Sequence, residues 1–180
     1  MKSKLITVLL GMSLLLISCK NDEKKQEQTV EDPNKELFKV TLDLVIKHND
    51  TLHLYYTEDN SINFTEEASI WQAVPGNPNA QQMTFILPKD VFPTQFRIDF
   101  GVNNKENEEI VLNGIKFNYL DKSFAAMGDN IFMYFRPDEN ATNLDRANRI
   151  LKRKNPSEKK GASLYPHETV LGPEILKLAK

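Results

Sequence analysis

Alternation of apolar and polar side chains is the feature that most constrains the fold of this chain, and it begins at Leu37. A period of two residues is typical of a β-strand with one buried face, because successive side chains point to opposite sides. The pattern recurs in short stretches along much of the chain: residues 38–47, 51–56, 68–74, 81–87, 96–100, 110–119 and 130–135. Short strands at nearly regular spacing predict an all-β fold, namely an antiparallel β-sandwich that is jelly-roll-like.

Three local signals refine this prediction. His48-Asn49-Asp50 is a turn signal, so the strands on its two sides are expected to form a hairpin. Residues 75–79 (Pro-Gly-Asn-Pro-Asn) are expected to end the strand around Trp71. At Asn113-Gly114 the apolar positions change from even to odd numbers. A β-bulge and a two-residue Asn-Gly hairpin both explain this change, and we favour the bulge because the preceding strand would otherwise be very short.

The segment after residue 136 is predicted to be a helical tail. Asp138 or Asn140 is suited to cap a helix that runs to about Arg153 and carries several basic residues in its C-terminal half. Residues 155–172 are expected to form an extended linker, and residues 173–180 a short final helix. The tail is therefore expected to follow the β-sandwich rather than belong to it.

The N-terminus carries a targeting signal. Lys2 and Lys4 precede an apolar run of about 13 residues, which is too short for the roughly 20 that span a bilayer, and Ser18 and Cys19 follow it. The stretch Leu16-Ile17-Ser18-Cys19 resembles the lipobox of bacterial lipoproteins. The resemblance implies cleavage before Cys19, a diacylglycerol thioether on its sulfur and an acyl chain, such as palmitate, on its amine. More than one acyl chain gives stable membrane anchoring.

The residues after the lipobox suggest a location. Lys20 stands where an aspartate would favour retention in the inner membrane, and residues 19–23 resemble the export signal of some gram-negative surface lipoproteins. These resemblances imply a lipid anchor in the outer membrane, with the protein on the periplasmic face or on the cell surface. The expected organisation is a signal peptide (1–18), a lipidated cysteine with a flexible charged tether (19–36), a β-sandwich domain (37–136) and a helical C-terminal tail (137–180).

Charge and motifs argue against two classes of protein. The net charge is −2, and it becomes −4 once residues 1–18 are removed, which is no signature of nucleic-acid binding. The single cysteine, Cys19, is no free nucleophile if it is lipidated, and the histidines (His48, His53 and His167) lack metal-ligand spacing. No catalytic motif is present. We therefore expect no enzyme activity, no catalytic residues, no cofactor and no metal site.

A second resemblance concerns the domain itself. Residues 96–101 (Phe-Arg-Ile-Asp-Phe-Gly) and 109–117, separated by a polar turn, resemble the late strands of carbohydrate-binding-module-like, galactose-binding-like jelly rolls. The resemblance covers about residues 37–136 and implies a jelly roll and, less directly, a sugar ligand. Sugar sites on sandwiches combine aromatic platforms with polar and charged side chains. The candidate ligand-binding residues are Tyr55, Trp71, Arg97 and Asp99.

Three of these candidates also have a purely structural interpretation. Trp71 could be a core tryptophan, since the only tryptophan of a small domain is usually packed, and Arg97 with Asp99 could be a solvated or cross-strand ion pair. The leading function is ligand binding, with carbohydrate the best guess. The alternative is a structural accessory subunit of a cell-envelope complex that uses the basic tail, residues 146–160. A binding module should expose Trp71, Tyr55 and Arg97 together, whereas an accessory subunit should bury Trp71.

Overall fold

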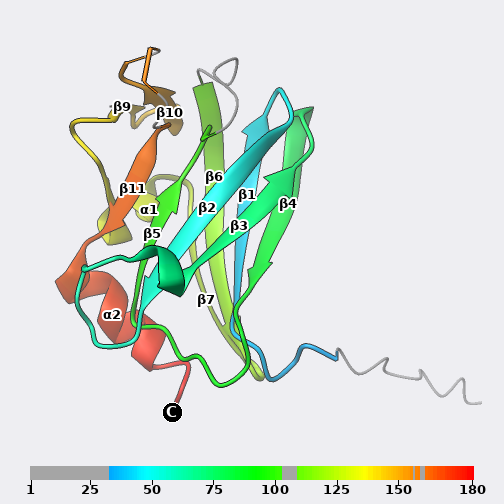
Figure 1. Ribbon diagram of the computed structural model, residues 1–180, viewed down its shortest axis with the longest axis vertical. Coiled ribbons are helices and arrows are strands. Elements are labelled where there is room, and N and C mark those ends of the chain that lie inside the picture. Colours follow the sequence, from blue (N-terminus) through cyan, green and yellow to red (C-terminus); the bar gives the residue numbers. More distant parts are fainter. Residues whose placement is uncertain (1–32, 103–108, 156, 159–160) are drawn as a thin grey trace, which may run out of the picture. The chain divides into compact units, whose positions relative to one another are not determined.

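The computed structural model describes residues 33–102, 109–155, 157–158 and 161–180 (Figure 1). The signal peptide and the lipidation of Cys19, together with nearly all of the tether, lie outside these residues and stay predictions. The described residues belong to one compact unit, Glu31–Lys180.

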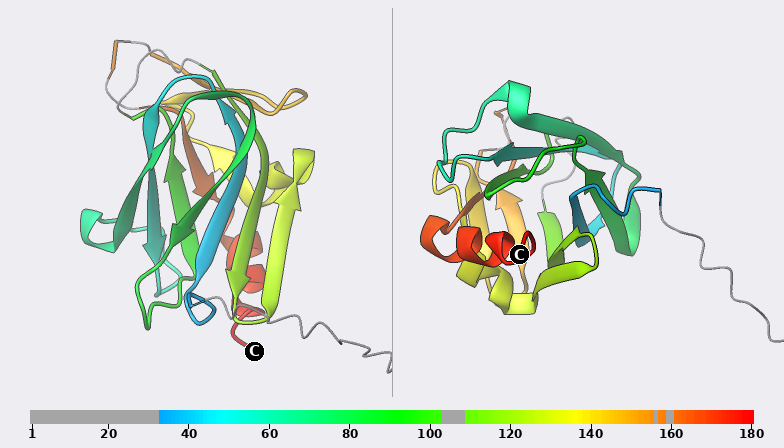
Figure 2. Two further views of the ribbon diagram at one scale, coloured as in Figure 1. Left: turned by 90° about the vertical axis from the view of Figure 1, so that its right-hand side faces the viewer. Right: turned by 90° about the horizontal axis from the view of Figure 1, so that it is seen from below.

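Two antiparallel sheets pack face to face as a sandwich (Figures 1 and 2). The first sheet has the order β4 (Asn77–Ile86), β1 (Lys39–Ile46), β6 (Glu109–Tyr119), β10 (Ile150–Arg153) and β9 (Thr142–Asp145), and β7 (Lys122–Met127) also pairs with β6. The second has the order β3 (Ser69–Val74), β2 (Asp50–Thr57), β5 (Gln95–Asp99), β11 (Ser163–Pro166) and β8 (Phe135–Pro137). Consecutive strands repeatedly fall in opposite sheets, as in a jelly roll. The predicted all-β sandwich is confirmed.

The described residues include four short helical segments. They are the 3₁₀ turns η1 (Glu66–Ala68) and η2 (Gly128–Asn130), the one-turn helix α1 (Ile131–Tyr134) and the C-terminal helix α2 (Glu168–Leu176). A short C-terminal helix is confirmed, although it begins and ends earlier than predicted. In this part of the chain, no helix combines the length and the apolar character that crossing a membrane requires.

The core lies between the sheets and explains the alternation. Every even-numbered residue of β1 from Val40 to Ile46 is fully buried, and so are Leu52 and Leu54 of β2. Phenylalanines fill the centre: Phe38, Phe85, Phe96, Phe100, Phe117 and Phe135. Because even-numbered residues of β2 and β5 point inward, the odd-numbered residues of these strands share the outer face of the second sheet.

The bulge is confirmed, and the predicted hairpin is wrong. Asp43 pairs with Gly114 while Leu44 pairs with Leu112, so Asn113 is the extra residue of a continuous β6. In contrast, β1 and β2 lie in different sheets, and the turn between them carries the chain across the sandwich. The alternation of each strand shows that one face is buried, but it does not tell which strand is the neighbour.

The predicted helical tail is wrong in its first part. The segment expected to form a helix up to Arg153 forms β9 and β10, which pair as a hairpin closed by a turn with Arg149 at φ 59°. The expected linker (155–172) contains β11 and the start of α2. These strands extend both sheets, so the sandwich does not end at residue 136. Leu151 of β10 and Leu164 of β11 are fully buried, so these strands contribute to the core of the sandwich.

Two further expectations concern the ends of strands. Of residues 130–135, which were expected to form a strand, 130–134 form helical turns and only Phe135 belongs to a strand, β8. The strand around Trp71, β3, ends at Val74 directly before the segment 75–79, as predicted, but β4 already begins at Asn77 and includes Pro78. Proline is tolerated there because β4 is an edge strand, which need not donate a hydrogen bond on its open side.

Candidate functional site

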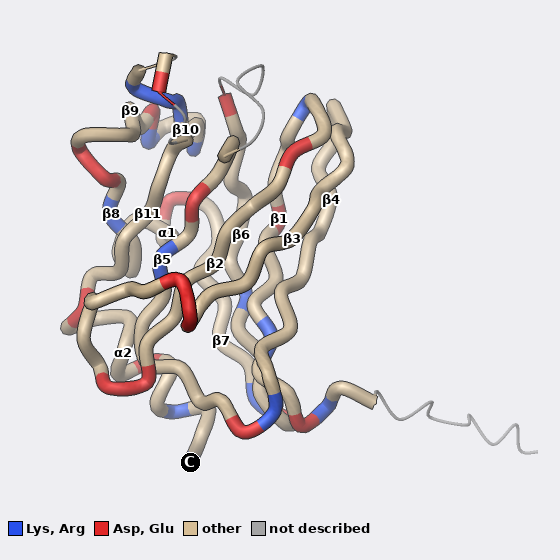
Figure 3. Tube along the Cα trace, in the orientation of Figure 1, with Lys and Arg blue, Asp and Glu red and all other residues tan. Residues whose placement is uncertain are grey.

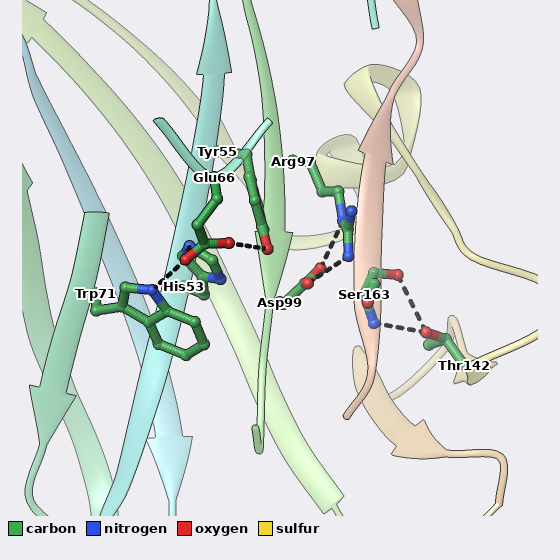
Figure 4. A network of polar contacts seen from close by, with 8 residues as sticks. All are labelled: His53, Tyr55, Glu66, Trp71, Arg97, Asp99, Thr142 and Ser163. Atoms are coloured by element: carbon green, nitrogen blue, oxygen red, sulfur yellow. Dashed lines mark hydrogen bonds and ion pairs between the residues drawn. The ribbon is translucent and has the colours of Figure 1, made fainter. Parts of the chain in front are cut away.

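The four predicted ligand-binding residues come together on the outer face of the second sheet (Figure 4). Trp71 lies on β3, Tyr55 on β2, and Arg97 and Asp99 on β5. The register pairs Tyr55 with Arg97, and it places His53 of β2 between Trp71 on one side and Asp99 on the other. Three adjacent strands therefore bring into one row residues that are up to 46 positions apart in the sequence.

Trp71, His53 and Tyr55 form a stack of rings along this row. The indole of Trp71 lies against the imidazole of His53 with ring centroids 3.6 Å apart and an interplanar angle of 20°. The ring of Tyr55 lies on the other side of the imidazole at 3.8 Å. His53 is only 1% exposed, whereas Trp71 is 46% exposed. The interpretation of Trp71 as a core residue is therefore wrong, because only one part of its ring is covered.

Glu66 of η1 joins two of these rings through its carboxylate. Nε1 of Trp71 donates a hydrogen bond to Oε1 of Glu66 (2.8 Å), and Oη of Tyr55 donates one to Oε2 (3.2 Å). Nε2 of His53 lies 3.6 Å from the same Oε1. The side chain of Glu66 is 62% exposed and belongs to the acidic turn that precedes β3 (Figure 3). One solvent-facing carboxylate thus faces three polar hydrogen-bonding atoms of the sheet.

Arg97 and Asp99 form an ion pair within β5 that water hardly reaches. Nε and a terminal nitrogen of Arg97 donate to the two carboxylate oxygens of Asp99, at 2.9 and 2.5 Å. Their side chains are 16% and 7% exposed, so the prediction of a solvated or cross-strand pair is wrong. Removing one partner of a buried ion pair leaves an uncompensated charge, which favours retention of both.

The row continues from Arg97 to the far edge of the sheet. The guanidinium of Arg97 lies over the rings of Tyr55 (4.6 Å to the centroid) and Tyr165 of β11 (5.0 Å). Arg136 of β8 lies over Tyr165 as well, at 5.6 Å. Phe64 contacts both tyrosines from the loop before η1, with ring centroids 6.4 and 6.0 Å away. All five strands of the second sheet therefore contribute to one row of rings and charges. The row consists of Trp71, His53, Tyr55, Arg97, Asp99, Tyr165 and Arg136, together with Phe64 and Glu66 from the segment before β3.

Burial and neighbouring charges shift the pKa values of three groups in this row. Burial raises the pKa of Tyr55 to about 12, and the carboxylates of Asp99 and Glu66 add to the shift. Burial lowers the pKa of His53 below its usual value; Glu66 and Asp99 oppose this shift and Arg97 reinforces it. Burial would also lower the pKa of Arg97, but its hydrogen bonds and ion pair with Asp99 outweigh that effect and raise it. At neutral pH the row therefore contains neutral rings and a compensated ion pair.

Sequence reasoning missed five members of this row: His53, Phe64, Glu66, Arg136 and Tyr165. The position of His53 two residues before Tyr55 on the same strand was a usable signal, because both then share a face. Glu66 lies in a loop, and nothing in the sequence pattern indicates that it reaches over β2 and β3. Tyr165 lies in a segment that was predicted to be a linker.

A cavity, possible metal-binding clusters and the basic tail were also considered as functional sites. A cavity of about 280 Å³ lies near Lys35, Lys39 and Tyr119, away from the row. Among the described residues, no cluster of three or more histidine, cysteine or acidic side chains is arranged to hold a metal ion. In the basic tail, Arg146 pairs with Asp129 and Lys152 with Glu109, so these cations are engaged within the chain.

Comparison with known proteins adds no assignment. No family model, no curated protein and no solved structure matches this chain. The functional argument therefore rests on the sequence motifs, the fold and the row on the second sheet.

Proposed function

We propose that this protein is a lipoprotein of the outer membrane, anchored through Cys19, whose β-sandwich binds carbohydrate on the outer face of its second sheet. The observation that carries the proposal is the exposure of Trp71 beside Tyr55, Glu66 and Arg97. The anchor rests on the lipobox, and the 19–36 segment serves as the tether between the membrane and the domain.

The geometry around Trp71 suits the surface of a sugar ring. His53 supports one face of the indole at 3.6 Å, and the 46% exposure of Trp71 leaves indole surface open to solvent. A large ring with little freedom to move loses little conformational entropy when an apolar sugar face packs on it. The exposed carboxylate of Glu66, next to Nε1 of Trp71, is placed to contact sugar hydroxyl groups.

Two features favour this function over that of an accessory subunit. Trp71 is exposed beside Tyr55 rather than buried, as a binding module requires, although Arg97 lies in the same row with only 16% of its side chain exposed. Two of the basic residues of the tail pair with carboxylates of the same chain, which leaves them less available for an acidic partner. Val170 and Leu176 of α2 are exposed apolar side chains and are the surface on which the alternative function would depend.

A glycan-array screen of the full chain in detergent micelles tests the proposal. Because Trp71 is the only tryptophan, its fluorescence reports directly on the row. We expect wild-type protein to bind specific glycans with a change in Trp71 emission, and Trp71→Ala to weaken binding at least tenfold. The matched control is Ile86→Ala, which truncates an exposed side chain on the first sheet and should bind like wild type. Equal binding by both variants would place the site elsewhere.

The anchor is tested separately by metabolic labelling. Wild-type protein is expected to incorporate labelled palmitate and to fractionate with outer membranes. Cys19→Ser is expected to remain unlabelled, because it lacks the sulfur that forms the thioether. Labelling of the serine variant would contradict the proposed anchor.

A further inference from the structure

The outer face of the second sheet presents three polar groups to one carboxylate. Nε1 of Trp71 and Oη of Tyr55 each donate a hydrogen bond to Glu66, and Nε2 of His53 lies 3.6 Å from it (Figure 4). These groups come from neighbouring strands, and the pairing of His53 with Trp71 fixes their spacing. The arrangement is complementary to a carboxylate, whose two oxygens can accept about four hydrogen bonds.

The rings that the sheet contributes are packed against one another, but one of their polar atoms lacks a hydrogen-bond partner. The imidazole of His53 is 1% exposed and held between two rings, and its Nε2 makes no hydrogen bond among the described residues. With its proton on Nε2, the imidazole is a third donor that Glu66 does not reach at hydrogen-bond distance. A buried polar group without a partner is costly, so a ligand that completes this bond gains free energy.

The Glu66 side of the arrangement is easily displaced. Its side chain is 62% exposed, and η1 is a single 3₁₀ turn whose residues are not buried. A solvated carboxylate can rotate into water at little cost, whereas the stacked rings stay in place. Glu66 therefore occupies the donors without being fixed to them.

We propose that Trp71, His53 and Tyr55 form a carboxylate-binding site that Glu66 fills in the free protein and that an acidic sugar of the uronic acid class fills in the complex. This inference rests on the proposed carbohydrate-binding function and specifies its ligand. The sugar carboxylate takes the place of the Glu66 carboxylate, and the ring that bears it packs on the exposed indole. Glu66 turns outward because two carboxylates cannot share the same donors without repulsion.

The proposal predicts that Glu66 competes with the ligand. The test titrates full-length protein in detergent with D-glucuronic acid and with D-glucose, which differ only at the carboxylate, at constant ionic strength and with Trp71 emission as the readout. Glu66→Ala is expected to bind glucuronic acid at least tenfold more tightly than wild type and to show no such gain for glucose. Glu66→Gln, which keeps the size of the side chain, should also strengthen glucuronic acid binding. The matched control is Glu67→Ala, an exposed neighbour outside the row, which should behave as wild type.

Sodium acetate separates this inference from the function on which it rests. In Glu66→Ala, acetate but not chloride is expected to shift Trp71 emission back toward that of wild type, because it refills the site without any sugar. If acetate acts and no sugar binds, the carboxylate site stands and the proposed function fails. If Glu66→Ala gains no affinity for glucuronic acid and shows no response to acetate, the carboxylate site is overturned, even where another glycan still binds through Trp71.

Discussion

His53 is the residue on which the row depends most, because it is buried between two aromatic rings and yet can carry a charge. The charged groups that face it are Glu66 from η1 and Arg97 and Asp99 from β5. Burial disfavours the protonated imidazole, and the two carboxylates recover only part of that loss. The folded chain therefore binds this proton less tightly than the unfolded chain, whose histidine titrates near 6.5.

This difference predicts a pH dependence of stability with a definite sign. Where the unfolded state binds more protons, the free energy of unfolding rises with pH. The contribution of His53 is therefore fully present above pH 6.5 and is lost as the pH falls through the lower pKa of the folded state. Urea unfolding between pH 7.5 and pH 5 measures it. His53→Gln should show a shallower loss of stability than wild type, whereas His48→Gln, at an exposed turn position, should retain the wild-type slope. Equal slopes in all three proteins would contradict the prediction.

At the scale of elements, the length of a strand decides how much of it the sequence reveals. Strands β1 and β6 have 8 and 11 residues, and their alternation, including the bulge at Asn113, is legible without a structure. Strands β9 and β10 have 4 residues each, which places only about two side chains on each face. In so short a segment the spacing of Leu144, Ala147 and Leu151 fits a helix as well as a hairpin.

The same limit applied to the candidate site. The side on which Tyr55, Arg97 and Asp99 lie follows from the parity of their strands, so their common outer face was predictable. Their neighbours were not, because pairing between β2, β3 and β5 is a property of the sheet and not of any one strand. Glu66 contacts this face from a turn, and such a contact leaves no periodic signal.

The backbone at Gly161 lies very close to the backbone of Phe100, and this leads to a second prediction. A Cβ at position 161 would overlap the carbonyl oxygen of Phe100, just where the chain enters β11 beside β5. A Cβ at position 114 would instead overlap the sulfur of Met127, a flexible side chain that is 50% exposed. Gly161→Ala is expected to lower the free energy of unfolding by about 3 kcal/mol, because backbone must move, and Gly114→Ala by about 1 kcal/mol or less. Denaturant unfolding of the two variants checks the order, and a larger loss in Gly114→Ala would contradict it.

At the scale of the whole molecule, the C-terminal third is part of the sandwich. Strand β10 continues the first sheet beside β6, and β11 continues the second between β5 and β8. Helix α2 packs beside the start of β5, where Nε2 of Gln95 donates a hydrogen bond to the carbonyl oxygen of Glu168 (3.0 Å). The row of the candidate site also ends on these elements, since Tyr165 lies under Arg97 and Arg136. The C-terminal strands therefore belong both to the sandwich and to the candidate site.

A chain that ends at Pro137 is accordingly expected not to fold. It lacks Leu151, Leu164, Leu171 and Ile175, each fully buried. Burying a side chain of this size contributes about 1.5–3 kcal/mol, so the four together approach the roughly 5–15 kcal/mol that stabilises a typical domain. The control ends at Leu178 and removes only the exposed Ala179 and Lys180. Cooperative urea unfolding followed by Trp71 emission should persist in the control and be absent from the shorter chain. Cooperative unfolding of the chain that ends at Pro137 would show instead that the first eight strands form a stable sandwich without the tail.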